Sequence, residues 1–264
     1  MIKLALFNIS ICLVLLLYSC SGESKKGLTI AASSVPHAEM LEHIKPDLEQ
    51  QGIHLTILVS DDYNMPNRAL ANGEIDANFF QHLPFLEEQQ KQFNYPIDSF
   101  AKIEIEPMGI YSKKIKSLNE LKAGSSVALP NDPTNEARAL LLLQELGLIS
   151  LDNSENLHVT VLNLKKNPKQ LKFIEVDAAM LPRTLDDVDA AAINTNYALA
   201  AGLSPIQDAL AIEGENSPYV NIIVIKIGDE NRADLQALKT AMTSKKMRTF
   251  ILEKYKGAII PAFP

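Results

Sequence analysis

The stretch GLTIAASSVPHAEMLEHIKPDLEQQGIHLTILVS, residues 27–60, sets the fold class. Residues 27–33 and 53–60 are short runs of β-branched and aliphatic residues, which is typical of strands. Between them, residues 36–51 carry apolar side chains at a helical spacing that is interrupted at Pro46. A strand, a helix and a strand in this order predict a parallel sheet with a right-handed crossover.

The same alternation continues along the chain. We expect further strands at 125–130, 158–164, 172–177, 189–194 and 218–225, and helices at 133–146 and from 233 onward. This pattern predicts an α/β protein with a parallel-rich sheet in each of two lobes. We expect lobe 1 to comprise residues 27–108 and 217–264, and lobe 2 to comprise residues 109–216, with a ligand cleft between them.

The first twenty residues, MIKLALFNISICLVLLLYSC, read as an export signal. A single positive charge at Lys3 precedes an apolar run that is too short for a permanent membrane span. The run ends in LYSC, which resembles the cleavage box of bacterial lipoproteins, where the cysteine becomes the lipidated first residue. We therefore expect a signal peptide over 1–19 and a lipidated tether over 20–26 that begins at Cys20. The alternative is an ordinary secretory signal with an incidental cysteine.

The composition excludes several classes of function. The chain of 264 residues has a formal net charge of −7, and such a surface repels nucleic acid and anionic lipid. Its two cysteines are Cys12, inside the expected signal, and Cys20, so the folded part has no thiol for a disulfide. No GxSxG, HExxH or GxxxxGK[ST] motif is present, and the five histidines lack the close spacing of a metal site. We expect no enzyme activity, no cofactor and no metal.

The segment EIDANFFQHLPF, residues 74–85, places polar and aromatic side chains together at the end of a predicted strand. In open parallel sheets, ligands bind beyond the carboxyl ends of the strands. Phe80 and His82 fall at this strand end, and Phe85 follows one turn later. The alternative is structural, because a lone histidine near apolar residues is often a hydrogen-bonded core group.

Other strand ends carry similar side chains. Tyr63 follows one predicted strand and Asn194 ends another. Asn221 is a polar residue inside an otherwise apolar strand, where it needs buried partners. Aromatic and amide groups thus recur where a ligand would bind, whereas paired catalytic acids do not.

Arg138 lies in the second turn of the helix that begins within PNDPTNEAR, residues 130–138. Helical side chains lean toward the helix N-terminus, where free N–H groups carry partial positive charge. A planar guanidinium beside them matches the two oxygens of a carboxylate. The alternative is a surface arginine that is solvated or paired with Glu136.

Four runs resemble the methionine-binding lipoproteins that serve bacterial ABC importers, over nearly the whole exported chain. They are DYNMPNRALANGEIDANFFQHLPFL (62–86), YSKKIKSLNELKAGSSVALPNDPTNEARALLLLQELGLI (111–149), LPRTLDDVDAAAINTNYA (181–198) and SPYVNIIV (217–224). The resemblance implies a two-lobed, periplasmic-binding-protein-like fold that captures methionine and delivers it to an ABC permease and its ATPase subunit. It also implies a monomer held at the cell membrane by acyl chains on Cys20, facing the periplasm or the exterior.

The resemblance also assigns roles within the pocket. Tyr63, Phe80 and His82 would line the space for the thioether side chain, together with Phe85, which stands where relatives often have tyrosine. Arg138 would take the ligand carboxylate. Asn194 and Asn221 would bind the zwitterionic backbone of the ligand. The alternatives are a lipoprotein that binds another small amino acid or a methionine-containing dipeptide, and a surface adhesin on the same scaffold.

The expected lipid anchor can be tested by the substitution Cys20→Ser. This change should release the protein from membranes without affecting the fold, because the polar segment SGESKK separates Cys20 from the globular body. Membrane fractionation combined with thermal unfolding measures both effects. A variant whose signal is cleaved and which still sediments with membranes would contradict lipidation at this cysteine.

Overall fold

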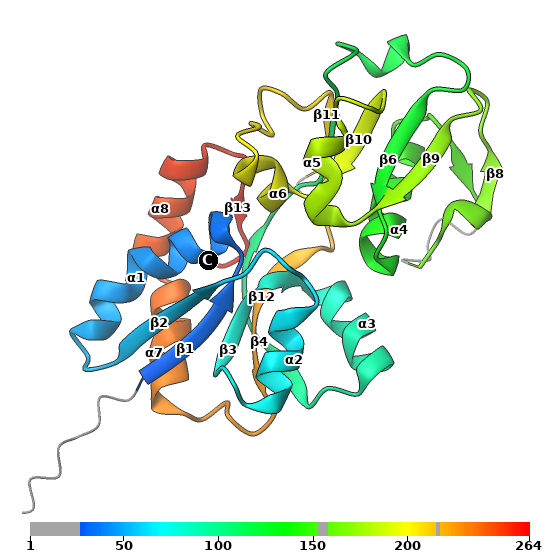
Figure 1. The fold of residues 1–264 in the computed structure, drawn as a ribbon. Coiled ribbons are helices and arrows are strands. Elements are labelled where there is room, and N and C mark those ends of the chain that lie inside the picture. Colours follow the sequence, from blue (N-terminus) through cyan, green and yellow to red (C-terminus); the bar gives the residue numbers. More distant parts are fainter. Residues whose placement is uncertain (1–26, 153–157, 215–216) are drawn as a thin grey trace, which may run out of the picture.

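The computed structural model describes residues 27–152, 158–214 and 217–264, arranged in two lobes (Figure 1). The expected signal and tether lie outside the described residues. The strands are β1 (Gly27–Ala32), β2 (His54–Val59), β3 (Ala77–His82), β4 (Ile97–Ile105), β5 (Gly109–Tyr111), β6 (Ser126–Pro130), β7 (Ser150–Leu151), β8 (Leu164–Lys166), β9 (Lys172–Val176), β10 (Ala190–Ile193), β11 (Ala211–Ile212), β12 (Val220–Lys226) and β13 (Ile260–Pro261). The α-helices are α1 (Glu39–Glu49), α2 (Met65–Asn72), α3 (Leu83–Phe93), α4 (Pro133–Glu145), α5 (Leu181–Thr184), α6 (Thr195–Ala200), α7 (Ala233–Met242) and α8 (Lys245–Tyr255).

The first lobe is built on a six-stranded sheet with the order β13-β4-β12-β3-β1-β2. Strand β1 pairs in parallel with β2 and β3, as the crossover pattern predicts. Strand β12 returns from the end of the chain and lies antiparallel between β3 and β4. One buried cluster packs α1, α7 and α8 against one face of the sheet, and a second packs α2 and α3 against the other (Figure 1).

The second lobe holds a five-stranded sheet with the order β11-β5-β10-β6-β9. Strand β6 pairs in parallel with β9 and β10, while β5 runs antiparallel to β10 and β11. Helix α4 packs in the buried cluster on one face, and α5 and α6 belong to the cluster on the other. Both sheets thus mix parallel and antiparallel strands, and the two-lobed α/β fold is confirmed.

The chain passes between the two sheets after β4 and again before β12. At the first passage, the backbone N–H of Met108 donates to the Glu213 carboxylate at 2.9 Å. At the second, the backbone N–H of Glu213 donates to the carbonyl of Met108, also at 2.9 Å. The two passages are therefore bonded to each other at the base of the cleft.

Two local expectations are wrong. The run 158–164 is not a strand: Thr160 caps a single 3₁₀ turn over Val161–Asn163, and β8 begins only at Leu164. Pro46 does not interrupt the first helix, because α1 continues through it to Glu49. In the part of the chain that the structure describes, no helix is long and apolar enough to cross a membrane.

Candidate ligand-binding site

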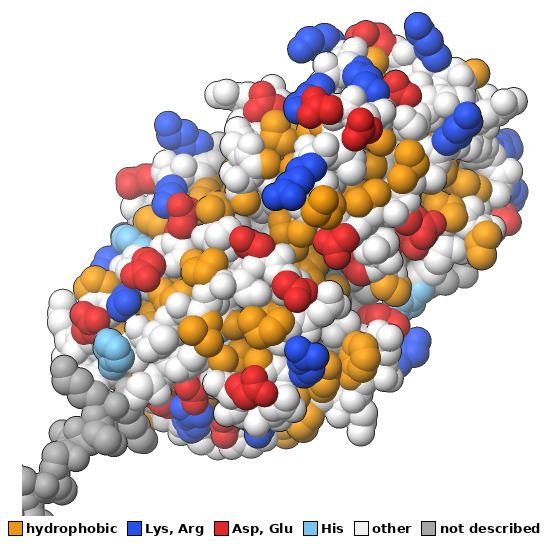
Figure 2. Space-filling model, in the orientation of Figure 1, with side chains coloured by type: hydrophobic (Ala, Val, Ile, Leu, Met, Phe, Trp, Pro, Cys, Tyr) orange, Lys and Arg blue, Asp and Glu red, His pale blue; other side chains and the backbone are white. Residues whose placement is uncertain are grey.

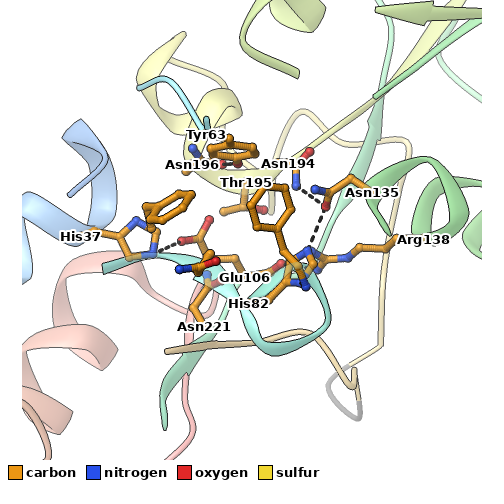
Figure 3. Close-up of a pocket in the computed structure, with 13 residues that line it drawn as sticks. His37, Tyr63, His82, Glu106, Asn135, Arg138, Asn194, Thr195, Asn196 and Asn221 are labelled. Carbon is orange, nitrogen blue, oxygen red and sulfur yellow. Dashed lines mark hydrogen bonds and ion pairs between the residues drawn. The ribbon is translucent and has the colours of Figure 1, made fainter. Parts of the chain in front are cut away.

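A cavity lies between the lobes, where strand ends and helix starts meet (Figure 3). The space within its lining, including the part that is open to solvent, is about 330 Å³. The first lobe contributes His37, Tyr63, Phe80, Gln81, His82, Phe85, Glu106 and Asn221. The second lobe contributes Asn135, Arg138, Asn194, Thr195 and Asn196. All seven predicted ligand-binding residues line this cavity.

A β-bulge gives strand β3 its local shape at the pocket. In the pairing with β12, Ile222 lies opposite Gln81 and Ile223 lies opposite Phe79, so Phe80 is the extra residue. Bulges are common beside binding sites because they redirect side chains. Phe79 packs in the core of the lobe while Phe80 faces the cavity.

Behind the cavity, the polar side chains of β3 form a buried amide network with α2. The side-chain oxygen of Asn67 accepts from the Asn78 amide at 2.9 Å and from the Gln81 amide at 2.5 Å. The Asn67 amide N–H in turn donates to the side-chain oxygen of Gln81 at 2.8 Å. Buried amides need such partners, because an unpaired polar group costs about 1–3 kcal/mol. Both faces of β3 are therefore buried, and the network fixes the strand end that carries Phe80 and His82.

His82 joins the two lobes as a neutral imidazole. Its Nδ1 accepts the backbone N–H of Phe85 at 3.1 Å and caps α3, so the ring proton belongs on Nε2. Nε2 then donates to the Asn135 side-chain oxygen at 3.1 Å, across the cleft. Burial, and then the charge of Arg138, lower the pKa of His82 to about 3. The ring thus combines pocket lining with a structural role.

The orientation of Asn194 follows from a chain of hydrogen bonds that begins at α4. Asp132 caps that helix, and the Asn135 side-chain amide donates to both of its carboxylate oxygens at 3.0 Å. The oxygen of Asn135 is thereby turned toward Asn194, whose amide N–H donates to it at 2.8 Å (Figure 3). The remaining Asn194 oxygen is buried and accepts no hydrogen bond from the described residues. It is an acceptor that a ligand N–H can use.

Aromatic rings form one wall of the cavity. The centroid of the Tyr63 ring lies 5.8 Å from that of Phe80, 5.8 Å from that of Phe85 and 5.0 Å from that of Tyr197. The Tyr63 hydroxyl donates to Asn196 of the second lobe at 2.7 Å. This wall suits an apolar ligand group with no charge.

Arg138 is a buried residue of the hinge, and the surface alternative is excluded by its exposed fraction of 3%. Its Nε donates to Glu213 at 2.8 Å, and its Nη2 donates to Glu213 at 2.5 Å and to the carbonyl of Glu106 at 2.7 Å. The guanidinium also stacks over the Tyr219 ring at 4.4 Å. Nη1 alone makes no hydrogen bond with the described part of the chain. The sequence predicts free N–H groups at the N-terminus of α4, and this expectation is wrong. The Asp132 carboxylate accepts from the backbone N–H of Asn135 and so caps the helix.

An acid cluster lies under the cavity. Asn221 of β12 lies opposite His82 on one side and Glu104 on the other. His37 Nε2 lies 3.3 Å from a Glu104 oxygen and 3.2 Å from a Glu106 oxygen, as the dashed line to Glu106 marks in Figure 3. Burial raises the pKa of both carboxyl groups above the ordinary range.

His37, Glu104 and Glu106 each offer one atom that could bind a metal ion, and these three atoms lie within 4.8 Å of one another. Among the described residues, this is the one set close enough to hold a cation. Burial lowers the pKa of His37, so its imidazole is neutral, and both carboxyl groups favour the protonated form.

Sequence reasoning missed six lining residues, namely His37, Gln81, Glu106, Asn135, Thr195 and Asn196. One signal was present in KIEIEPM, where Glu104 and Glu106 alternate with isoleucines and therefore share one face of a mostly buried strand. The partner of Arg138 gave no local signal, because Glu213 lies 75 positions later.

A larger outer cleft adjoins the cavity at Tyr63 and Phe85. Its acidic lining consists of Asp61, Asp62, Glu88, Asp132 and Asp177. The face in Figure 2 likewise carries acidic side chains where the lobes meet. The outer cleft is thus unfavourable for a second anionic group.

The two sheets, the two passages and the polar and aromatic cavity between the lobes are the architecture of solute-binding proteins. Residues 28–263 match the family described as NlpA lipoprotein. The chain belongs to this family, whose members are lipoproteins associated with a membrane outside the cytoplasm.

Individual relatives are similar over most of their length. A methionine-binding lipoprotein of Bacillus subtilis (strain 168) is 40% identical over 242 residues, which cover 90% of this chain and 88% of that protein. A D-methionine-binding lipoprotein of Escherichia coli (strain K12) is 41% identical, with 84% and 82% covered. The structure of a nutrient-binding protein from Burkholderia cenocepacia bound to methionine is 43% identical, with a TM-score of 0.87, and covers 89% of this chain and 100% of that chain.

The neutral state of His82 predicts a specific acid sensitivity. Because its pKa is lowered in the folded state, its contribution to stability is complete above the unfolded value of about 6.5 and is lost as the pH falls toward about 3. His82→Asn keeps an N-cap acceptor but cannot titrate. We expect the free energy of unfolding of ligand-free protein, measured in urea, to fall between pH 6.5 and pH 4. The fall should be roughly 1–4 kcal/mol smaller for this variant than for the wild type.

His54→Asn is the matched control, since His54 is exposed on the edge strand β2. This control should follow the wild-type pH profile. Parallel profiles for His82→Asn and the wild type would contradict a neutral, helix-capping His82.

Proposed function

We propose that the chain captures free methionine and delivers it to an ABC importer. The observation that carries this proposal is the mixed lining of the cavity, which combines clustered aromatic rings with polar groups that are free to bind a ligand. Tyr63, Phe80 and Phe85 supply the rings, and Arg138 and Asn194 supply a donor and an acceptor. An amino acid with an apolar side chain combines the same two kinds of group.

The aromatic wall of the cavity suits the side chain of methionine. A thioether is polarisable, and its contact with aromatic rings contributes about 0.3–1.5 kcal/mol beyond burial. The relatives named for methionine are similar over 84–90% of the chain, which favours this side chain over others.

The ligand carboxylate is assigned to Arg138. Two edges of the guanidinium are occupied by Glu213 and by the Glu106 carbonyl, which leaves Nη1 for a ligand. A buried carboxylate needs such a donor, because an unpaired ion in the interior costs several kcal/mol. The acceptor oxygen of Asn194 and the amide of Asn221 complete the contacts proposed for the ligand backbone.

Closure of the lobes would complete the site. Three hydrogen bonds already cross the cleft: Tyr63 to Asn196 at 2.7 Å, Tyr197 to the Asp61 carbonyl at 2.6 Å, and His82 to Asn135 at 3.1 Å. Each joins a group near the cavity in one lobe to a group in the other, so a ligand that stabilises the closed form also stabilises these bonds.

The proposal extends to the lobe boundaries, the oligomeric state and the location of the protein. We assign lobe 1 to residues 27–108 and 217–264 and lobe 2 to residues 109–216, because each sheet draws its strands from these ranges. We also propose a monomer that is anchored through lipid on Cys20, faces the periplasm or the exterior, and docks on a permease with its ATPase subunit.

Isothermal titration calorimetry of refolded, ligand-stripped protein against a panel of amino acids tests the function. Methionine should bind about tenfold to 100-fold more tightly than alanine, because burial of the longer apolar side chain contributes about 1.5–3 kcal/mol. Binding of no amino acid, or a preference for a charged one, would overturn the proposal.

The role of Arg138 can be tested with methionine amide, which lacks the carboxylate. The wild type should bind methionine at least about tenfold more tightly than the amide, since hydrogen bonds to charged groups contribute roughly 1.5–3 kcal/mol. Arg138→Lys keeps the charge but loses the fork geometry, so it should discriminate much less between the two ligands.

Arg183→Lys, at an exposed position of α5, is the matched control and should behave as the wild type. Thermal unfolding of the variants separates a loss of folding from a loss of recognition. Equal wild-type affinity for methionine and its amide would contradict the arginine assignment.

A further inference from the structure

Glu106 presents a buried carboxyl group to the cavity from the passage that follows β4 (Figure 3). Its side chain is 4% exposed, and its Oε1 accepts no hydrogen bond of good geometry from the described residues. The His37 imidazole is close to this oxygen, with its Nε2 atom at 3.2 Å. A buried acceptor that faces a ligand cavity is available to a donor on the ligand.

The groups that donate to the two carboxyl groups are neutral: the Asn221 side chain donates to Glu104, and the backbone N–H of Asn196 donates to Glu106. His37 places Nδ1 2.5 Å from the Ser33 hydroxyl, so a neutral imidazole can direct only one N–H at Glu104 and Glu106 together. Burial penalises even a single carboxylate here, and a second charge would be repelled by the first, so both carboxyl groups hold their protons when no cation is nearby. Burial raises the pKa of both groups, in agreement with this protonated state.

The other titratable groups around Glu106 do not change this balance. They are Glu104 of β4, His37 before α1, Arg138 of α4, Tyr63 after β2 and Tyr255 of α8. Arg138 is the fixed cation among them, and its charge is matched by Glu213. A ligand ammonium would therefore meet no unmatched negative charge in the cavity unless Glu106 ionises.

We propose that Glu106 receives the α-ammonium group of the ligand, and that the Glu104–Glu106 pair releases one proton to solvent when the ligand binds. This inference rests on the proposed function, since it assumes an amino acid in the cavity. The O–H bond of one carboxyl group breaks, its proton passes to water, and the ammonium N–H groups donate to the carboxylate that remains. Asn194, whose oxygen also lacks a donor, supplies a second acceptor.

Binding should then depend on pH with a defined sign. Protons compete with the ammonium group for Glu106, so affinity is greatest where the carboxyl group ionises readily and falls as the pH is lowered. The limiting dependence is about tenfold in dissociation constant per pH unit for one proton released. His82 does not contribute near neutral pH, because burial keeps its ring unprotonated.

Calorimetry with L-methionine in two buffers of different ionisation enthalpy measures the released proton directly. The wild type should release close to one proton per methionine at about pH 6.5, and its affinity should weaken as the pH falls from about 8 to about 6. Glu106→Gln should bind methionine about tenfold or more weakly and release almost no proton.

Specificity for the amine provides a second readout. The wild type should strongly prefer methionine to its des-amino analogue, 4-(methylthio)butanoate, and Glu106→Gln should lose most of that preference. Glu136→Gln is the matched control: Glu136 is also buried, but it accepts from the Val161 backbone and does not line the cavity. This control should match the wild type in all three measurements.

The outcomes separate the two proposals. If the wild type binds methionine without releasing a proton at about pH 6.5, or if Glu106→Gln binds it as tightly as the wild type, then Glu106 is only a partner of His37 and the inference fails while the proposed function stands. The wild-type proton measurement decides the question even if Glu106→Gln does not fold. If the wild type binds no methionine, both proposals fail together.

Discussion

The buried ion pair between Arg138 and Glu213 joins the second lobe to the segments that connect the two lobes. Arg138 projects from the second lobe and bonds to both passages of the chain, through the Glu106 carbonyl and the Glu213 carboxylate. Glu213 in turn accepts from the backbone of Met108. Removing one member of such a pair typically costs about 3–5 kcal/mol, because the other charge remains buried and unpaired. The hinge geometry and the position of Nη1, the proposed ligand donor, therefore depend on one interaction.

The polar groups of the cavity are oriented by their second partners. Asp132 turns the Asn135 amide, and Asn135 then orients Asn194 and accepts from His82. The amide network behind β3 similarly fixes the strand end that carries Phe80 and His82. Few side-chain rotations are left for the ligand to fix, which lowers the entropic cost of binding.

The sequence predicts those parts of the fold that depend on local pattern. The crossover at residues 27–60 and the helix after PNDP are visible because apolar periodicity and capping residues lie within one turn of each other. The antiparallel position of β12 between β3 and β4 is not visible, since it joins segments more than one hundred positions apart. The strand expected at 158–164 failed because Thr160 and Asn163 form a capping box that competes with extended backbone.

The candidate site also has features that the sequence predicts and features that only the packing of the lobes reveals. Aromatic and amide residues at strand ends could be selected from the sequence, and the family resemblance gave them roles. The partners that set their chemistry could not, since Glu213 and Asn135 reach Arg138 and His82 only through the packing of the two lobes. Arg138 illustrates the difference: its residue type indicates a carboxylate receptor, but two of its three nitrogens are bound within the hinge.

Native mass spectrometry of protein purified without added ligand tests the central claim most directly, which is that the closed cavity holds one free methionine. The account predicts one bound molecule with the mass of methionine, released when the protein is unfolded and restored when the stripped protein is given methionine. A protein that carries no ligand and takes up none, or that carries a peptide in its place, would contradict it.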